Sequence, residues 1–137
     1  MTDKKEILFV CVENAGRSQM AEAFFKKIGP KNFIASSAGT KPAPQVNPIV
    51  IQAMNEIGID ITNNKPKILS EKIIPQTTKT VNMGCMDQKE CPALFTSDIL
   101  DWKIPDPKGK SIEDVRKIRD MIESKINDLV FKLKEES

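Results

Sequence analysis

The stretch ILFVCVENAGRSQMAEAFF, residues 7–25, joins a short apolar run to an amphipathic segment through a loop with one glycine. The run over residues 6–11, EILFVC, is apolar after its first residue and rich in β-favouring residues, which is typical of a fully buried strand. Over residues 18–28 the apolar side chains recur with a helical period, and a Gly-Pro pair then ends the pattern. The stretch therefore predicts a buried strand, a tight loop over residues 11–18 and a helix.

The rest of the chain continues this alternation of strands and helices. Strand patterns cover residues 32–39, 78–85 and 98–104. Helical patterns run from Pro48 to Gly58 and from Ser111 to about Lys134, the second with an apolar stripe along its whole length. Alternating strands and helices predict a parallel sheet with helices on both faces, in a single α/β domain over residues 1–137.

The composition argues against several classes of function. The chain has 137 residues, a net charge of +2, and basic residues scattered among acidic ones, a pattern that does not indicate nucleic-acid binding. No apolar run approaches the roughly 18 residues that a membrane helix needs. The first six residues are not those of a signal peptide. We therefore expect a cytoplasmic protein that binds neither nucleic acid nor membrane.

The chain has three cysteines and no histidine. An odd number of cysteines in a reducing compartment argues against a disulfide framework, which leaves inert thiols, a metal site, or redox and nucleophilic chemistry. Without histidine there is no histidine base, and three cysteines alone make a poor zinc site. We expect no metal, and acid–base work must fall to Asp, Glu, Cys or Lys.

The loop between the first strand and the first helix is the expected ligand site of an open α/β sheet. Backbone N–H groups and the helix dipole would form an oxyanion-binding loop there, made of Val12, Glu13, Asn14, Ala15, Gly16 and Arg17. Arg17 can hold two oxygens at once, the same field would favour the Cys11 thiolate, and Ser18 can hydrogen-bond that sulfur. A lone cysteine is more often an inert buried residue, but its place between strand and helix favours a nucleophile.

The segments CVENAGRS and QMAEAFF, the SSAG after the second strand and EIGIDI at 56–61 resemble the low-molecular-weight protein tyrosine phosphatase family. Within that family the sequence is most similar to the thioredoxin-coupled arsenate reductases. The resemblance runs from Ile7 to the last helix. It implies a four-stranded parallel sheet flanked by helices, catalysis without metal or organic cofactor, and a monomer.

The resemblance also implies a general acid. In this family it is an Asp in an Asp-Pro pair, which matches Asp106-Pro107, although such a pair is by itself a common turn. Phosphatases of this type usually have aromatic residues after the pair. Here Lys108 follows, and the chain has no tyrosine, which counts against an aryl phosphate substrate.

Cys85 and Cys91, followed by a proline, resemble the two resolving cysteines of arsenate reductases, with a spacing one residue shorter. The resemblance implies that Cys11 attacks arsenate, a phosphate analogue, with Asp106 as acid. Cys85 then releases arsenite by forming a disulfide with Cys11, and Cys91 moves that disulfide outward for thioredoxin. Two alternatives stay open: a phosphatase with protective cysteines, and a non-catalytic oxyanion-binding or redox-sensing module.

Several positions depart from the relatives. Gly16 stands where a second loop cysteine is frequent, and Glu13 stands where a glycine is common, so its charge would oppose an oxyanion unless it points outward. Some relatives bind potassium beside the loop. Asn14 and Ser37 match that site, but Lys65 and Lys67 replace its Thr and Asp. We therefore expect no potassium, a lysine ammonium in its stead, and Asn14 and Ser37 bracing the loop by hydrogen bonds.

Overall fold

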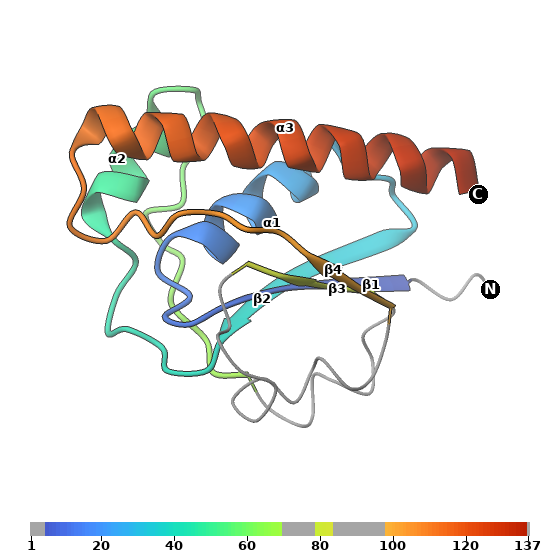
Figure 1. Cartoon of the computed structure of the whole chain (residues 1–137), viewed down its shortest axis with the longest axis horizontal. Helices are drawn as coiled ribbons and strands as arrows, with labels where there is room; N and C mark the ends of the chain where they lie inside the picture. Colours follow the sequence, from blue (N-terminus) through green and yellow to red (C-terminus); the bar gives the residue numbers. More distant parts are fainter. Residues whose placement is uncertain (1–4, 70–78, 84–97, 137) are drawn as a thin grey trace.

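The computed structural model describes residues 5–69, 79–83 and 98–136. Strands and helices alternate along these residues, apart from the two strands β3 and β4 (Figure 1). The elements are β1 (Lys5–Cys11), α1 (Arg17–Ile28), β2 (Phe33–Gly39), α2 (Pro48–Asn55), β3 (Lys79–Asn82), β4 (Asp98–Asp101) and α3 (Ile112–Glu136).

The strands form one four-stranded sheet in the order β2-β1-β3-β4, and every pairing is parallel. The register pairs Cys11 with Gly39 at the ends of β1 and β2, and Asn82 with Asp101 at the ends of β3 and β4. All four carboxyl ends therefore lie at the same edge of the sheet. The predicted parallel sheet is confirmed, and its topology brings the loop after β1 close to the segment after β4.

The core lies between β1 and the helices. Ile7 and Phe9 are fully buried and belong to one apolar cluster with the inner faces of α1, α2 and α3. Phe9 contacts the rings of Phe25 and Trp102, with ring centroids 5.9 and 6.2 Å away. Leu8 and Val10 alternate to the opposite face and are equally buried, as expected for a strand covered on both sides. The described helices cover the face of Ile7 and Phe9 (Figure 1), and helices over the second face stay a prediction.

Helix α3 packs along α1 and α2 through the apolar stripe read from the sequence. Its buried positions include Val115, Ile118, Ile122, Ile126, Leu129 and Leu133. Acidic residues Glu113 and Asp114 lie in its first turn, where they complement the helix dipole. Its bounds confirm the predicted helix. No helix in the described ranges combines the length and the apolar character needed to cross a membrane.

Three elements end earlier than the sequence predicts. Strand β3 ends at Asn82, whereas the sequence pattern predicts a strand to residue 85. Helix α2 ends at Asn55, and a turn in which Gly58 has φ 83° follows, so the predicted end at Gly58 is wrong by one turn. Strand β4 ends at Asp101 because β3, its partner, ends at Asn82 and offers no further residue to pair. Trp102 donates its N–H to the Asn82 carbonyl at 2.9 Å and leaves the strand there, so the predicted strand to residue 104 is wrong.

Candidate active site

The loop after β1 points its carbonyl groups outward. Four carbonyl oxygens of residues 11–15 accept hydrogen bonds of 2.8–3.4 Å from backbone N–H groups of residues 40–47. In a trans peptide the carbonyl and the following N–H point in opposite directions. The N–H groups of residues 12, 13, 14 and 16 are therefore directed to the inside of the loop. This arrangement, at the N-terminus of α1, can bind an anion.

Cys11 lies inside this ring of N–H groups and is 2% exposed. The Asn14 N–H donates to its Sγ at 3.2 Å, and the Ser18 Oγ lies 2.8 Å from the same sulfur. The Asn14 Nδ2, which can only donate, approaches the Ser18 Oγ at 2.7 Å. The Ser18 hydroxyl, which accepts from Asn14, can donate its proton to the Cys11 Sγ. The Asn14 N–H, the Ser18 hydroxyl and the N-terminus of α1 therefore all lie at this sulfur.

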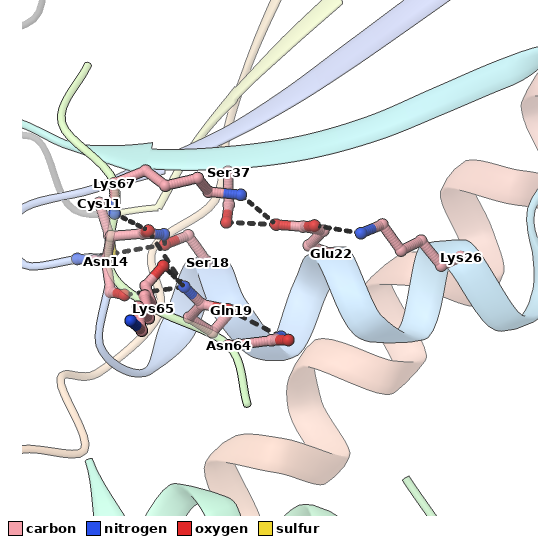
Figure 2. Close-up of polar contacts among 10 residues, drawn as sticks. All are labelled: Cys11, Asn14, Ser18, Gln19, Glu22, Lys26, Ser37, Asn64, Lys65 and Lys67. Atoms are coloured by element: carbon pink, nitrogen blue, oxygen red, sulfur yellow. Dashed lines mark hydrogen bonds and ion pairs between the residues drawn. The ribbon is translucent and has the colours of Figure 1, made fainter. Parts of the chain in front are cut away.

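Asn14 is the brace of the loop (Figure 2). It has φ 51°, a left-handed conformation that asparagine tolerates better than most residues. Its Oδ1 accepts from the Lys67 backbone N–H at 2.8 Å and from the Gln19 Nε2 at 3.1 Å, which fixes the orientation of the amide. Gln19 also donates to the carbonyls of Asn14 and Lys65, at 3.2 and 3.3 Å. The Asn14 side chain, which bonds Ser18, is therefore itself held by two donors, the Lys67 N–H and the Gln19 amide.

Glu22 lies one helical turn after Ser18, and its side chain is 6% exposed. Its carboxylate pairs with Lys26 at 2.5 Å and with the Lys67 ammonium at 3.4 Å, as Figure 2 shows. Ser37 donates its hydroxyl to the same carboxylate. The Ser37 hydroxyl therefore bonds helix α1, which it faces from β2, and its support of the loop stays a prediction. The Lys67 ammonium lies beside Ser37 and Glu22, while Lys65 contributes its carbonyl.

Arg17 and Asp106 face each other across the loop. Arg17, with a side chain 11% exposed, donates through Nη1 to the Ile104 carbonyl at 3.0 Å. Its Nη2 lies 3.8 Å from the Asp106 Oδ2. The other Asp106 oxygen accepts the Lys108 backbone N–H at 3.0 Å, and the carboxyl is 54% exposed. The guanidinium is thus pre-oriented at the mouth of the loop, with a carboxyl beside it.

These groups line one pocket of about 490 Å³. Its lining residues come from the loop after β1, the segment before α2 and the segment after β4, and are Cys11, Glu13, Ala15, Gly16, Arg17, Ala43, Pro44, Gln45, Asn47, Pro48, Asp106, Pro107, Lys108 and Gly109. Among the residues that the structure describes, no aromatic side chain lines this pocket. It offers a tetrahedral anion a place to bind but offers an aryl group no ring to stack on.

Two glycines allow close approaches around the pocket. A Cβ on Gly39, at the end of β2, would lie 2.5 Å from the Val12 carbonyl oxygen, so the loop can pack on this strand end only over a glycine. A Cβ on Gly16 would lie 2.7 Å from the Cγ of Pro107. The segment that carries Asp106 therefore packs directly on the loop at Gly16. A cysteine at this position would have to displace that segment.

Residues singled out from the sequence are thus partly brought together. Cys11, Ser18, Arg17 and Asp106 share one pocket or its wall, whereas Cys85 and Cys91 lie outside the described residues. Sequence reasoning missed Gln19 and Glu22. Gln19 lies one position after Ser18, and Glu22 lies one helical turn after it. Both are polar residues that the helical pattern places next to the buried face, and this placement could have indicated their role.

The anion loop, its cysteine and the facing arginine and aspartate are the geometry of a cysteine-dependent enzyme acting on oxyanions. Residues 6–137 match the family of low molecular weight phosphotyrosine protein phosphatases, and the chain belongs to this family. Within it, the chain is 38% identical to Arsenate reductase 2 of Staphylococcus epidermidis over 125 residues, which cover 90% of this chain and 95% of that protein.

Solved structures give the same relationship. The thioredoxin-dependent arsenate reductase of Corynebacterium glutamicum has a TM-score of 0.84 at 29% identity, over 99% of this chain and 65% of that chain. This chain thus spans about two thirds of that protein. The YwlE arginine phosphatase of Geobacillus stearothermophilus has a TM-score of 0.85 at 28% identity, over 96% of this chain and 94% of that one. The fold is therefore common to reductases and phosphatases.

Proposed function

We propose that this chain is an arsenate reductase in which Cys11, Cys85 and Cys91 act in turn, which thioredoxin recycles, and which needs no metal or organic cofactor. The observation that supports the proposal most is the ring of inward N–H groups around the Cys11 Sγ, with Arg17 at its mouth. The 38% identity to an arsenate reductase favours arsenate as the oxyanion. A pocket wall without aromatic side chains in the described residues agrees with an inorganic substrate.

The first step uses the residues of the pocket. Arsenate binds to the loop N–H groups and to Arg17, and the Cys11 thiolate attacks arsenic. An S–As bond forms and an As–O bond breaks, and Asp106 gives its proton to the oxygen that leaves as water. Ser18 holds the Cys11 sulfur in line at 2.8 Å and stabilises it again when it later departs. Arg17 carries the charge on the remaining arsenate oxygens.

The next steps pass two electrons to arsenic. The Cys85 thiolate attacks the Cys11 sulfur, so an S–S bond forms, the S–As bond breaks, and its electron pair reduces arsenic, which leaves as arsenite. Cys91 then attacks Cys85, which regenerates the Cys11 thiolate and leaves a Cys85–Cys91 disulfide. The dithiol of thioredoxin reduces that disulfide. Three thiols are the minimum for this sequence, and the chain has three.

A phosphatase is the second candidate, favoured by the likeness to the arginine phosphatase. Phosphoryl transfer needs only the nucleophile, the anion loop and an acid, all of which Cys11, Arg17 and Asp106 can supply. The two functions therefore share the pocket and differ in their need for Cys85 and Cys91.

The test is steady-state turnover with thioredoxin, its reductase and NADPH. We expect the wild-type protein to consume NADPH only when arsenate is present. Cys85→Ser and Cys91→Ser should each abolish that consumption, while Cys85→Ser should retain any hydrolysis of a small aryl phosphate. Full arsenate-dependent consumption by both variants would refute the relay, and hydrolysis without any arsenate-dependent consumption by wild type would favour the phosphatase.

A further inference from the structure

An ion pair crosses the mouth of the pocket. The Lys108 Nζ donates to the Glu13 Oε1 at 2.9 Å, and both residues line the pocket. Glu13 belongs to the anion loop and Lys108 to the segment after β4 that carries Asp106. The Glu13 side chain is 33% exposed and that of Lys108 is 71% exposed. The pair thus links the loop that binds the anion to the segment that carries the proposed acid, at the solvent side of the site.

Glu13 poses an electrostatic problem that this pair addresses. The loop N–H groups are directed to an anion, and a carboxylate in the same loop would repel that anion. The repulsion energy would be twice as large for a doubly charged ligand as for a singly charged one. The ammonium of Lys108 offsets this charge at hydrogen-bond distance. The contact is mutual, because the hydrogen bond and the charge of Glu13 raise the pKa of Lys108 above its ordinary value.

A second observation separates the charge of Lys108 from its backbone role. The Lys108 backbone N–H donates to the Asp106 Oδ1 at 3.0 Å, whereas its side chain contacts Glu13. A substitution that keeps the backbone and the apolar stem but removes the ammonium therefore leaves the turn around Asp106 intact. Lys110 provides a matched control: it lies two positions later on the same segment, and it does not line this pocket.

We propose that Lys108 is a specificity-determining residue that neutralises Glu13 at the pocket mouth and thereby admits doubly charged inorganic oxyanions. This inference rests on the proposed function for the choice of oxyanion. The neutral pair contributes no net charge to the mouth, so the affinity for the anion comes from the loop N–H groups and Arg17. Without Lys108 the mouth is acidic and disfavours dianions, and without Glu13 it is basic and favours them.

A double-mutant cycle tests this with inorganic phosphate as the probe. Phosphate protection of Cys11 against alkylation by iodoacetamide, read by mass mapping of the Cys11 peptide, reports binding without turnover. One unpaired charge several Å from a dianion should change affinity by about ten-fold at low salt. We expect Lys108→Met to weaken phosphate binding by about that factor and Glu13→Gln to tighten it. The double variant should return to near the wild-type value.

Salt distinguishes charge from structure in the same experiment. Because Lys108 is exposed and Glu13 is partly exposed, the differences should shrink strongly at about 0.5 M salt, where the screening length is only a few Å. Lys110→Met should bind phosphate like wild type. The proposal is refuted if the two single variants shift binding in the same direction, if the double variant does not restore it, if Lys110→Met matches Lys108→Met, or if the differences persist at high salt.

Failure of this proposal and failure of the proposed function give different results. The cycle uses neither arsenate nor thioredoxin, so phosphate binding that follows the expected pattern supports the role of Lys108 even if arsenate is not reduced. Conversely, arsenate-dependent NADPH consumption with phosphate binding that is insensitive to Lys108→Met supports the reductase and overturns this inference.

Discussion

Replacing Asn14 by alanine should destabilise the protein far more than an ordinary loop substitution. The Asn14 side chain makes three hydrogen bonds in a buried site: from the Lys67 N–H at 2.8 Å, from the Gln19 Nε2 at 3.1 Å, and to the Ser18 Oγ at 2.7 Å. The substitution removes all three and leaves the Lys67 N–H and the Ser18 hydroxyl each without one partner. It also places alanine at φ 51°.

The size of the effect follows from these contacts. Each hydrogen bond contributes about 0.5–1.5 kcal/mol net to the free energy of unfolding. Alanine in the left-handed region costs roughly another 1 kcal/mol. We therefore expect Asn14→Ala to lower the free energy of unfolding by about 3–5 kcal/mol. Cys11 should also be alkylated more slowly near neutral pH, because Ser18 is no longer held toward its sulfur.

Urea unfolding, analysed by linear extrapolation, measures the change in free energy. Asn64→Ala is the matched control, since this exposed residue donates from its Nδ2 to the Gln19 Oε1 of the same network at 3.2 Å. That control should lose less than about 1 kcal/mol. If Asn14→Ala loses no more stability than Asn64→Ala, the loop does not depend on the hydrogen bonds of Asn14.

Three further predictions concern charged groups. Arg17→Lys should lose most arsenate turnover, because an ammonium keeps the charge but not the two-point grip; near-normal kcat/KM would exclude Arg17 as the anion clamp. Asp106→Asn should slow turnover by on the order of 10²–10⁴ while phosphate protection of Cys11 stays similar or improves; wild-type kcat would make Asp106 a turn residue. Arg116 donates to the Glu56 carboxylate at 2.6 and 2.9 Å and lowers the pKa of that carboxyl below its ordinary 4.5. Arg116→Gln should therefore lower the free energy of unfolding most at pH values above 4.5. This loss should vanish as the pH falls through the lowered pKa of Glu56. Equal losses in urea unfolding at acid and neutral pH would contradict the last prediction.

The strand, loop and helix at the start of the chain could be predicted from the sequence because the local pattern of apolar residues indicates each of them. A continuous apolar run can only be a buried element, and the position of Cys11 at its end then places the thiol at the carboxyl edge of the sheet. The apolar stripe of α3 could also be predicted, because apolar residues recur along it with a helical period. These elements depend on residues close together in the sequence.

The features that the sequence did not reveal depend on chain segments far apart. The donor that fixes the Asn14 amide is the backbone N–H of Lys67, and a backbone group leaves no signature in the residue type. Glu13 looked unfavourable for an anion loop because its partner, Lys108, lies on another segment at the same sheet edge. The end of β4 was set by the length of β3 and not by its own residues.

A trapped disulfide reveals the order in which the three thiols react. Cys91→Ser is mixed with one equivalent of arsenate and no thioredoxin, quenched in acid, digested and mapped by mass. We expect one arsenite released per enzyme and a disulfide between Cys11 and Cys85, because no thiol remains to move it outward. Arsenite release with Cys11 still reduced, or no arsenite and no disulfide at all, would contradict the relay.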